Sequence, residues 1–289
     1  MPAAPVLSII GGILAGGEYR LERHTIIIPT YNERENIITL VDDILALDLD
    51  SRIIIVDDNS PDGTGDLAAR LAVTHPSVRA IHRPSKLGLG TAHIAGMKAA
   101  LDEGVAWILT MDADFSHRPS YILGLLAGLD GFDVVIGSRY TKGGGTRYCT
   151  APRKALSQGA NLFARTLLGL HAGDATAGFR GYRREVLESI GLDRIRSDGY
   201  SFLIEVLYRC QQQGWRIGEI PIIFENRQRG ASKISKTEII KALQTVARLA
   251  WAPSADVDPT RSTLLGARRA MQPGAHDSVE ITPDGGVAR

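Results

Sequence analysis

The chain has 289 residues, with 33 Lys and Arg against 32 Asp and Glu, so its formal net charge is +1. This length fits one large domain or two small ones, and it can bury a core without disulfides or metals. A charge this close to zero gives no global field that would attract nucleic acid, and we expect no nucleic-acid partner. The two cysteines, Cys149 and Cys210, are too few for a disulfide framework or a cysteine-rich zinc site. A reducing, cytoplasmic location is the simplest interpretation.

The two ends of the chain differ in composition from its middle. Residues 1–23 hold a short apolar stretch that no basic residue precedes, which favours a leader over a signal peptide. Residues 253–289 are polar and rich in Pro, Gly and Ala, and we predict a disordered tail there. No apolar run reaches the roughly 18 residues of a membrane span. We therefore expect one folded domain over residues 24–234, followed by an amphipathic segment over residues 235–252.

Short β-branched runs alternate with helical patterns in the first half of the chain. The predicted strands are 24–29, 52–56, 78–82, 106–111 and 133–136, and the predicted helices are 33–47, 67–73 and 90–101. This alternation is typical of right-handed βαβ crossovers and predicts an α/β fold with a mostly parallel, Rossmann-like sheet flanked by helices. In such sheets ligands bind beyond the carboxyl ends of the strands. Polar clusters at residues 29–33, 57–63 and 112–117 fall at those ends.

The pattern is looser after residue 139. Residues 139–153 are rich in Gly and basic side chains and are expected to form a mobile loop. Further predicted elements are helices at 153–168 and 201–213 and a strand at 215–224 that Pro221 interrupts.

The segment 235–251 has apolar residues on one helical face and cations such as Lys236, Lys241 and Arg248 on or near the other. Two interpretations are equally supported by this pattern. The apolar face could lie in a membrane interface with the lysines toward anionic headgroups, or it could pack on the domain or on a partner subunit.

An acidic pair follows the predicted strand 106–111. Asp112 and Asp114 are hard oxygen donors of the kind that hold Mg²⁺ or Mn²⁺ against a diphosphate, although such pairs also serve as caps and turns. The metal would neutralise charge on a departing diphosphate. For the nearby His117, packing within the loop is favoured over a role as a ligand.

Two other groups of residues are candidates for binding. Asp57 and Asp58 end the strand 52–56 and could accept hydrogen bonds from a base or ribose, or simply form a capped turn. Arg139, Arg227 and Lys233 lie in basic segments that could clamp a phosphate, against the alternative of a solvated basic surface. The chain lacks the P-loop spacing, a G-x-G-x-x-G after the first strand and a G-x-S-x-G elbow. This argues against P-loop NTPases and most dinucleotide enzymes.

Several motifs in order give the chain a family resemblance that spans about residues 24–240. They are PTYNE, VDDNSPDGT, KLGLGTA, MDADFSH, GSRY, TAGFRGYRR, GYSFLIE and NRQRGASKIS. Together they resemble family 2 glycosyltransferases and, within these, polyprenyl-phosphate (dolichol-phosphate) mannosyltransferases. The resemblance implies a GT-A fold over residues 24–234.

The resemblance also implies roles for particular residues. The nucleotide would be held by Pro29, Tyr31, Glu33, Val56, Asp57 and Asp58. The motif Asp112-Ala113-Asp114 would bind metal and diphosphate, with Ser116 as a third metal contact where some relatives carry Gln. Arg139 would lie near the reacting phosphates, and Arg227 and Lys233 would close over the donor or acceptor phosphate. Asp174 and Arg180 lie in a matching segment without an assigned chemistry.

The implied activity is the transfer of mannose from GDP-mannose to a polyprenyl monophosphate, with inversion, Mg²⁺ or Mn²⁺ as cofactor, and Asp114 and Arg139 as the catalytic pair. We expect a peripheral protein on the cytoplasmic face of a membrane, with a membrane-anchoring subunit as a candidate partner. A glucosyltransferase using UDP-glucose is the nearest alternative. A nucleotidyltransferase is disfavoured because no Gly- and Arg-rich phosphate signature follows the first strand. The intact acidic motif disfavours a non-catalytic subunit.

Overall fold

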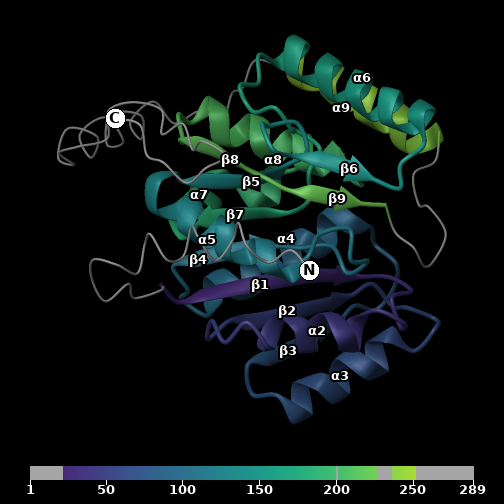
Figure 1. Ribbon diagram of the computed structural model, residues 1–289, viewed down its shortest axis with the longest axis vertical. Coiled ribbons are helices and arrows are strands. Elements are labelled where there is room, and N and C mark those ends of the chain that lie inside the picture. Colours follow the sequence, from purple (N-terminus) through teal and green to yellow (C-terminus); the bar gives the residue numbers. More distant parts are fainter. Residues whose placement is uncertain (1–21, 200, 227–235, 252–289) are drawn as a thin grey trace. The chain divides into compact units, whose positions relative to one another are not determined.

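A seven-stranded sheet forms the centre of the computed structural model, which describes residues 22–199, 201–226 and 236–251 (Figure 1). Its strand order is β3-β2-β1-β4-β7-β5-β8. The strands are β1 (His24–Thr30), β2 (Arg52–Asp57), β3 (Val78–His82), β4 (Trp107–Thr110), β5 (Val134–Ser138), β7 (Arg180–Arg183) and β8 (Ile217–Pro221). All of them are parallel except β7, which runs antiparallel to both β4 and β5. The predicted mostly parallel α/β sheet is therefore confirmed.

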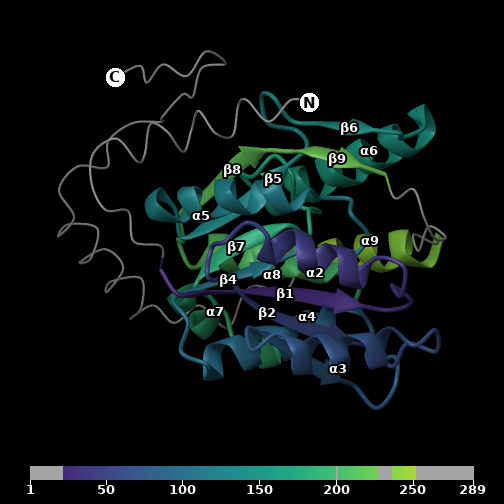
Figure 2. The same ribbon diagram turned by 60° about the horizontal axis from the view of Figure 1, so that its bottom comes forward.

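The central strands are built from β-branched runs because both of their faces are covered by helices. In β1, Ile26, Ile27 and Ile28 are fully buried and pair in parallel with the isoleucines of β2. The covering helices are α2 (Ile37–Leu45), α3 (Thr64–Thr74), α4 (Leu89–Asp102), α5 (Ile122–Gly131), α7 (Arg184–Ser189) and α8 (Ser201–Gln212). Helix α4 packs on β1 and β2 and against α7 and α8, whereas α5 packs on β5, β7 and β8 (Figure 2).

Strand β7 is the element that sequence patterns miss. Its sequence RGYR lacks a β-branched run, yet Arg180 is fully buried and Tyr182 is nearly so. Carbonyl oxygens satisfy the guanidinium, because Arg180 Nη1 donates to Leu203 O and Nη2 to Ala175 O, each at 2.8 Å. These partners are distant in the sequence or lie in a loop, so no local pattern indicates the strand. Helices α5 and α7 and the 3₁₀ turns η1 (Pro119–Tyr121) and η2 (Leu192–Arg194) were also not predicted.

The segment expected to be a mobile loop contains regular structure instead. Strand β6 (Gly145–Arg147) pairs in parallel with β9 (Ile223–Glu225) in a second, two-stranded sheet, and α6 (Ala151–Leu168) begins within the same segment. The pairing was not predictable because β6 and β9 lie far apart in the sequence. The predicted break at Pro221 is confirmed, since β8 ends there and the chain changes sheets.

Helix α9 (Lys236–Trp251) packs against α6 and α8. Its cations are not all directed as the sequence suggested. Arg248 is directed inward, where it donates to the buried Glu205 of α8 at 2.7 Å, whereas Lys241 lies 3.6 Å from Asp198 and keeps 43% of its side chain exposed, so its contact with headgroups stays a prediction. Within the described ranges, none of the helices combines the length and apolar character that crossing a bilayer requires.

Candidate functional site

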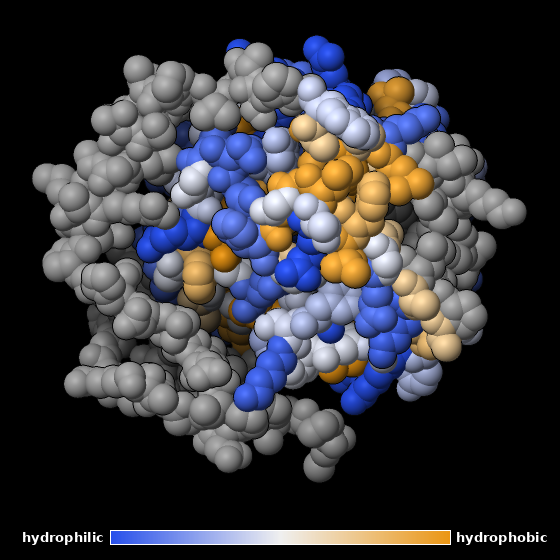
Figure 3. All heavy atoms as spheres, turned by 90° about the horizontal axis from the view of Figure 1, so that it is seen from above, coloured by the Kyte–Doolittle hydropathy of each residue, from blue (hydrophilic) through white to orange (hydrophobic). Residues whose placement is uncertain are grey.

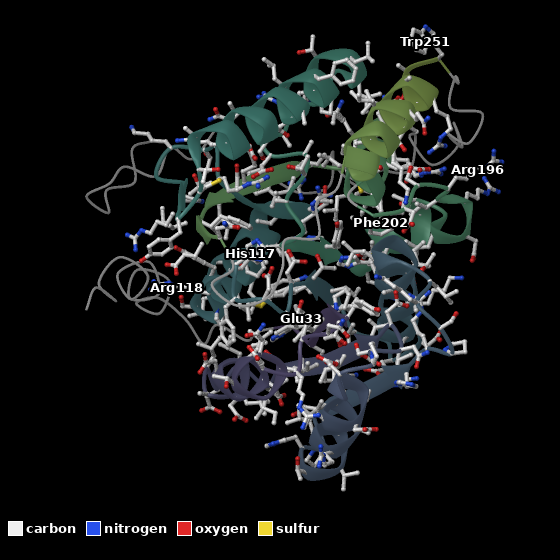
Figure 4. The ribbon with its side chains drawn as sticks, turned by 90° about the vertical axis from the view of Figure 1, so that its right-hand side faces the viewer. Glu33, His117, Arg118, Arg196, Phe202 and Trp251 are labelled. Carbon is white, nitrogen blue, oxygen red and sulfur yellow. The ribbon has the colours of Figure 1, made fainter. Side chains whose placement is uncertain are left out.

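A cavity of about 840 Å³ lies beyond the carboxyl ends of β1, β4 and β5. Residues that follow these strands form its floor, and residues of α6, α8 and α9 form the opposite wall. In Figure 4, Glu33 and His117 lie in the central part of the view, below α6 and α9. The cavity therefore combines the strand ends, where α/β sheets bind their ligands, with a helical wall from the second half of the chain.

The turns that follow the strands adopt backbone conformations that side chains rarely take. Asn32 after β1, Asn59 after β2 and Phe115 after β4 have φ angles of 57°, 58° and 57°. Asn tolerates this left-handed region, whereas a bulky residue such as Phe115 adopts it at a cost of roughly 1–3 kcal/mol. Such strain persists only where surrounding contacts enforce it, and functional sites are where it concentrates. The turn that carries the acidic pair is thus held in a strained backbone conformation.

Asp112 and Asp114 both line the cavity, together with Ala113 and Ser116. The backbone N–H of Ser116 donates to Asp114 Oδ1 at 3.0 Å, which fixes that carboxylate within its turn. A Cβ added at Gly178 would lie 3.3 Å from both carboxylate oxygens of Asp112. Glycine is therefore favoured at position 178, where a side chain would crowd the acidic pair.

The donor set at this turn fits a hard divalent cation. Asp112 keeps 33% of its side chain exposed, and Asp114 is 8% exposed. Mg²⁺ and Mn²⁺ take oxygen ligands and commonly use one or two carboxylates, with substrate phosphates and water completing the shell. In the part of the chain that the structure describes, no group of three His, Cys, Asp or Glu side chains forms a metal cage. The pair therefore suits a metal that is shared with a phosphorylated ligand.

His117 is held by aromatic rings, as expected for a packing histidine. Its ring stacks on Phe179 at 5.1 Å and meets Phe224 edge-on at 5.5 Å. Burial, with a contribution from the charge of Arg139, lowers the pKa of His117 to about 4, against the opposing effect of nearby carboxylates. The imidazole is therefore neutral at pH 7. Its Nδ1 atom lies 3.9 Å from Asp112 and has no hydrogen-bond partner among the described residues.

One end of the cavity carries the residues expected to bind a nucleotide. Pro29, Tyr31 and Glu33 follow or end β1 and all line the cavity. The ammonium group of Lys86 lies 3.8 Å from the centroid of the Tyr31 ring, a cation–π contact. Glu33 is buried, and its Oε2 accepts a hydrogen bond from Asn36 at 2.9 Å.

The two aspartates after β2 have separate roles in the structure. Asp58 lines the cavity, binds Arg83 at 2.8 Å, and accepts the backbone N–H groups of Leu87 and Gly88. Asp57 and Val56 are not among the lining residues. The Asp57 carboxylate is buried and accepts hydrogen bonds from Thr30 and Ser60 within the sheet edge. Asp57 thus supports the edge on which Asp58 and the residues of β1 lie.

Arg139 enters the cavity from the end of β5, where its side chain keeps 13% exposure. Its Nε and Nη2 atoms each donate to Asp174 at 2.7 Å, which is a two-pronged ion pair. Burial opposes the charge on Arg139, but the hydrogen bonds and charge of Asp174 outweigh it and raise the pKa of Arg139. The nearby charge of Asp112 acts in the same direction. The cavity therefore presents a permanent cation beside the acidic pair.

The helical wall adds residues that sequence analysis did not select. Lys154, Ser157 and Phe163 of α6 line the cavity, as do Lys241 and Val246 of α9. The hydroxyl of Ser157 lies 3.1 Å from that of Tyr140, which follows Arg139 in the chain. A lysine or serine on a surface helix carries no distinctive local signal, so only the packing of α6 over the sheet edge brings these residues to the site. The sequence-predicted Arg227 and Lys233 lie outside the described residues.

Fold and cavity together define a class: an α/β protein whose acidic and basic groups meet at the strand ends and can hold a phosphorylated, metal-bound ligand. Comparison with known families makes this specific. Residues 25–191, more than half of the chain, match the family model described as glycosyl transferase family 2. The chain belongs to glycosyltransferase family 2, and the resemblance drawn from its motifs is confirmed.

Two curated relatives are similar over most of their length. The chain is 43% identical over 245 residues to the polyprenol monophosphomannose synthase of Mycolicibacterium smegmatis, covering 84% of this chain and 92% of that protein. It is 41% identical over 238 residues to the undecaprenyl-phosphate mannosyltransferase of Micrococcus luteus, covering 82% and 97% of the two chains.

A solved structure has a similar fold. GalNAc-T7 with UDP, GalNAc and Mn²⁺ matches with a TM-score of 0.54, at 14% identity, over 91% of this chain and 53% of that one. At this identity the match concerns the fold alone. It agrees with the predicted GT-A fold, which is confirmed.

Proposed function

We propose that the protein transfers mannose from GDP-mannose to a polyprenyl monophosphate and releases GDP, with inversion at the anomeric carbon. The observation that carries this proposal is one cavity that joins an acidic strand-end motif and the fixed cation Arg139 to a wall formed by α6 and α9. The names of the two relatives, a polyprenol monophosphomannose synthase and an undecaprenyl-phosphate mannosyltransferase, support mannose as the transferred sugar and a polyprenyl phosphate as the acceptor.

The reaction needs little proton transfer. An oxygen of the acceptor phosphate attacks the anomeric carbon of mannose, and the bond from that carbon to the diphosphate breaks with its electron pair leaving on GDP. A phosphate monoester has a second pKa near 6 and is already largely anionic at neutral pH. No strong general base is therefore required, and the proposed reaction assigns no such role to the neutral His117. The main task is to bring two anions together.

The donor would lie along the edge of the sheet that the carboxyl ends of the strands form, which we call the sheet edge. Tyr31 offers a ring face, and Glu33 and Asp58 offer carboxylates to the nucleoside, with Pro29 and Ala113 shaping the floor. A divalent cation, Mg²⁺ or Mn²⁺, bound by Asp112 and Asp114 with Ser116 nearby, would neutralise charge on the diphosphate. We expect Val56 and Asp57 to act indirectly, because neither lines the cavity. Arg227 and Lys233 are proposed to close over a phosphate.

The acceptor phosphate would lie between Arg139 and the helical wall. Lys154 and Lys241 add two further cations to the cavity from α6 and α9. Charge-assisted contacts from these groups would offset the repulsion between the acceptor phosphate and the donor diphosphate. The neighbouring side chains Phe163, Leu243 and Val246 supply an apolar path for the first carbons of the isoprenoid. The site thus has a polar and an apolar end, as the acceptor does.

The outer faces of α6 and α9 favour a peripheral position on a membrane. Figure 3 shows an apolar patch on the face where these helices lie. Its large exposed side chains on the two helices are Leu162, Phe163, Leu167, Leu243 and Trp251. Trp251 is 78% exposed and projects from the end of α9 (Figure 4). Since Trp and Leu side chains insert at bilayer interfaces, this patch would lie on the cytoplasmic leaflet that presents the acceptor. The inward face of α9 packs on the domain through Val246 and Leu249.

The test is a transfer assay with purified full-length protein. It would be incubated with Mg²⁺ or Mn²⁺, a short polyprenyl phosphate, and radiolabelled GDP-mannose or UDP-glucose in parallel, and label would be counted in the organic phase. We expect label from GDP-mannose only, and none after chelation of the metal by EDTA. Label from UDP-glucose alone would show that the donor is UDP-glucose and not GDP-mannose. No label from either donor, even with added membranes that supply an anchoring subunit, would reject the proposal.

A further inference from the structure

The segment 172–176, between α6 and β7, contains a carboxylate that holds the cavity arginine. Asp174 is fully buried, and three groups of Arg139 donate to it: the backbone N–H at 3.1 Å, and Nε and Nη2 at 2.7 Å. The same Nη2 also donates to the Thr176 hydroxyl at 2.7 Å. A fork of this kind fixes both the position and the plane of a guanidinium. It leaves Nη1 as the edge without a hydrogen bond to the described residues.

Asp174 also lies close to a second arginine. The charge of Arg180 contributes to lowering the pKa of Asp174, in addition to the hydrogen bonds and charge of Arg139, all of which outweigh the opposing effect of burial. The Asp174 carboxylate therefore stays ionised at neutral pH.

The backbone around Asp174 is held from two sides. From β8, Glu219 accepts the N–H groups of Gly173 and Asp174 at 2.8 and 2.9 Å. From α6, Asn161 donates to the carbonyl of Gly173 and accepts the N–H of Ala175 at 2.9 Å. The segment is thus fastened both to the central sheet and to the helix that forms the acceptor wall. Its carboxylate cannot shift without breaking several hydrogen bonds.

We propose that Asp174 is a positioning residue for the transfer reaction: anchored between α6 and β8, it fixes the guanidinium of Arg139 so that its remaining edge meets the reacting phosphates. The proposal rests on the proposed function, because Arg139 must contact a phosphate for its orientation to matter. Asp174 itself lines no part of the cavity. It therefore acts through Arg139 and touches no substrate.

The test is a double-mutant cycle with Asp174→Asn and Arg139→Lys. Lysine keeps the charge but cannot form the fork, and asparagine keeps the shape but loses the charge that orients the arginine. Each single variant is expected to lower kcat about 30-fold, with the KM for GDP-mannose within about threefold of wild type. The kcat of the double variant should be within about threefold of that of the less active single variant, because both changes remove the same ion-pair geometry.

A matched control is available elsewhere in the sheet. Arg216 donates its backbone N–H, Nε and Nη2 to Asp133 at 2.9, 3.1 and 3.1 Å, which repeats the geometry of the Arg139 fork. Neither residue lines the cavity. Asp133→Asn should therefore leave kcat within about twofold of wild type, whatever it does to the melting temperature.

The outcomes separate the possible explanations. If Asp174→Asn keeps wild-type kcat, or if its loss adds fully to that of Arg139→Lys, the positioning role is wrong. An equal loss in the Asp133→Asn control would mean that any lost ion pair impairs the enzyme, which also overturns the proposal. Should Asp174→Asn fail to fold, Thr176→Val removes the contact with Nη2 and the hydrogen bond from the Thr176 hydroxyl to Asp174, and it should lower kcat about threefold to tenfold. An unchanged kcat in this variant would then reject the positioning role. An inactive wild type would instead contradict the proposed function.

Discussion

The sheet edge and the helical wall of the cavity are built on different principles. The edge is formed by short turns after buried parallel strands. Asp58 and Asp114 accept hydrogen bonds there from backbone N–H groups, and Arg139 donates to the buried Asp174. The wall is formed by α8 together with α6 and α9, and the last two each bury one face and expose large apolar side chains on the other. Under the proposed function, the edge would be preorganised for charged groups and the wall would receive the lipid.

The sharpest way to test the role of the edge is to remove the carboxylate that we propose binds the metal. Asp114→Ala should abolish transfer, with a loss of about 10³-fold or more in kcat, because the charge on the departing diphosphate is no longer neutralised. Circular dichroism should show an unchanged fold. Near-normal turnover in a folded variant would exclude this role for Asp114.

The role of the wall can be tested by making its outer face polar. Replacing Leu162, Leu167 and Trp251 together by Ser should weaken binding to vesicles by about 10³-fold or more, since each buried apolar side chain contributes roughly 1.5–3 kcal/mol and every 1.4 kcal/mol is tenfold. Co-sedimentation with vesicles that contain anionic lipid would measure it. Val73 of α3 is also exposed but lies on another element, so Val73→Ser is the matched control. If the control weakens binding as much as the triple variant, α6 and α9 do not form the docking surface.

A smaller effect is expected for the nucleotide end of the edge. Tyr31→Ala should weaken binding of GDP, measured by isothermal titration calorimetry, about tenfold, because the ring offers a stacking face for the base. Tyr31→Phe removes only the hydroxyl and should bind GDP within about threefold of wild type. Equal affinity of the Ala variant would show that the base lies elsewhere in the cavity.

The smallest effect on turnover is expected where the wall is fastened to the domain. Burial would raise the pKa of Glu205, but hydrogen bonds from Ser197, Arg248 and Arg209 outweigh it and lower that pKa from 4.5. A lowered folded-state pKa adds stability above the unfolded value and loses it as pH falls through the folded one. Glu205→Gln should therefore lower the melting temperature at pH 7 by about 5–10 °C, corresponding to roughly 3 kcal/mol.

That difference should shrink as the pH falls from about 4.5 through the lower pKa of folded Glu205, because the unfolded chain binds the proton first and the folded carboxyl binds it only at lower pH. Thermal melts of both proteins between pH 3 and 7 would measure it. A melting difference that does not change with pH would mean that the ionised form of Glu205 is not what holds α9. Turnover of Glu205→Gln at 25 °C should be close to wild type.

Much of the sheet edge could be predicted from the sequence because its signals are local. Isoleucine runs, the turn residues after them and the pair Asp112 and Asp114 are all visible within a few positions. The limits of local patterns appear at Asp57 and Asp58. Their positions in the sequence do not distinguish them, but only Asp58 lines the cavity. Asp57 is the last residue of β2 and its carboxylate is bound by Thr30 and Ser60, whereas Asp58 lies beyond the end of the strand.

The rest could not be predicted because it depends on contacts between distant segments. The role of Asp174 rests on Arg139, Asn161 and Glu219, which lie 13 to 45 positions away. Strand β7 forms around a buried Arg180 whose partners are backbone carbonyls. Neither feature has a periodic or compositional signature, and both become visible only when the sheet has brought these segments together.

The antiparallel strand at the middle of the sheet has a consequence for the order of assembly. Among the strands that the structure describes, β5 pairs with β7 and β8 alone, and both are later in the chain. During synthesis, β1 to β4 can pair with one another as they leave the ribosome, but β5 emerges more than 40 residues before its first partner. The half of the sheet that carries Arg139 therefore has to wait for residues 180–183, while the half that carries the acidic pair does not. Nascent chains are thus expected to complete the half of the sheet that carries Asp112 and Asp114 first and the half that carries Arg139 last.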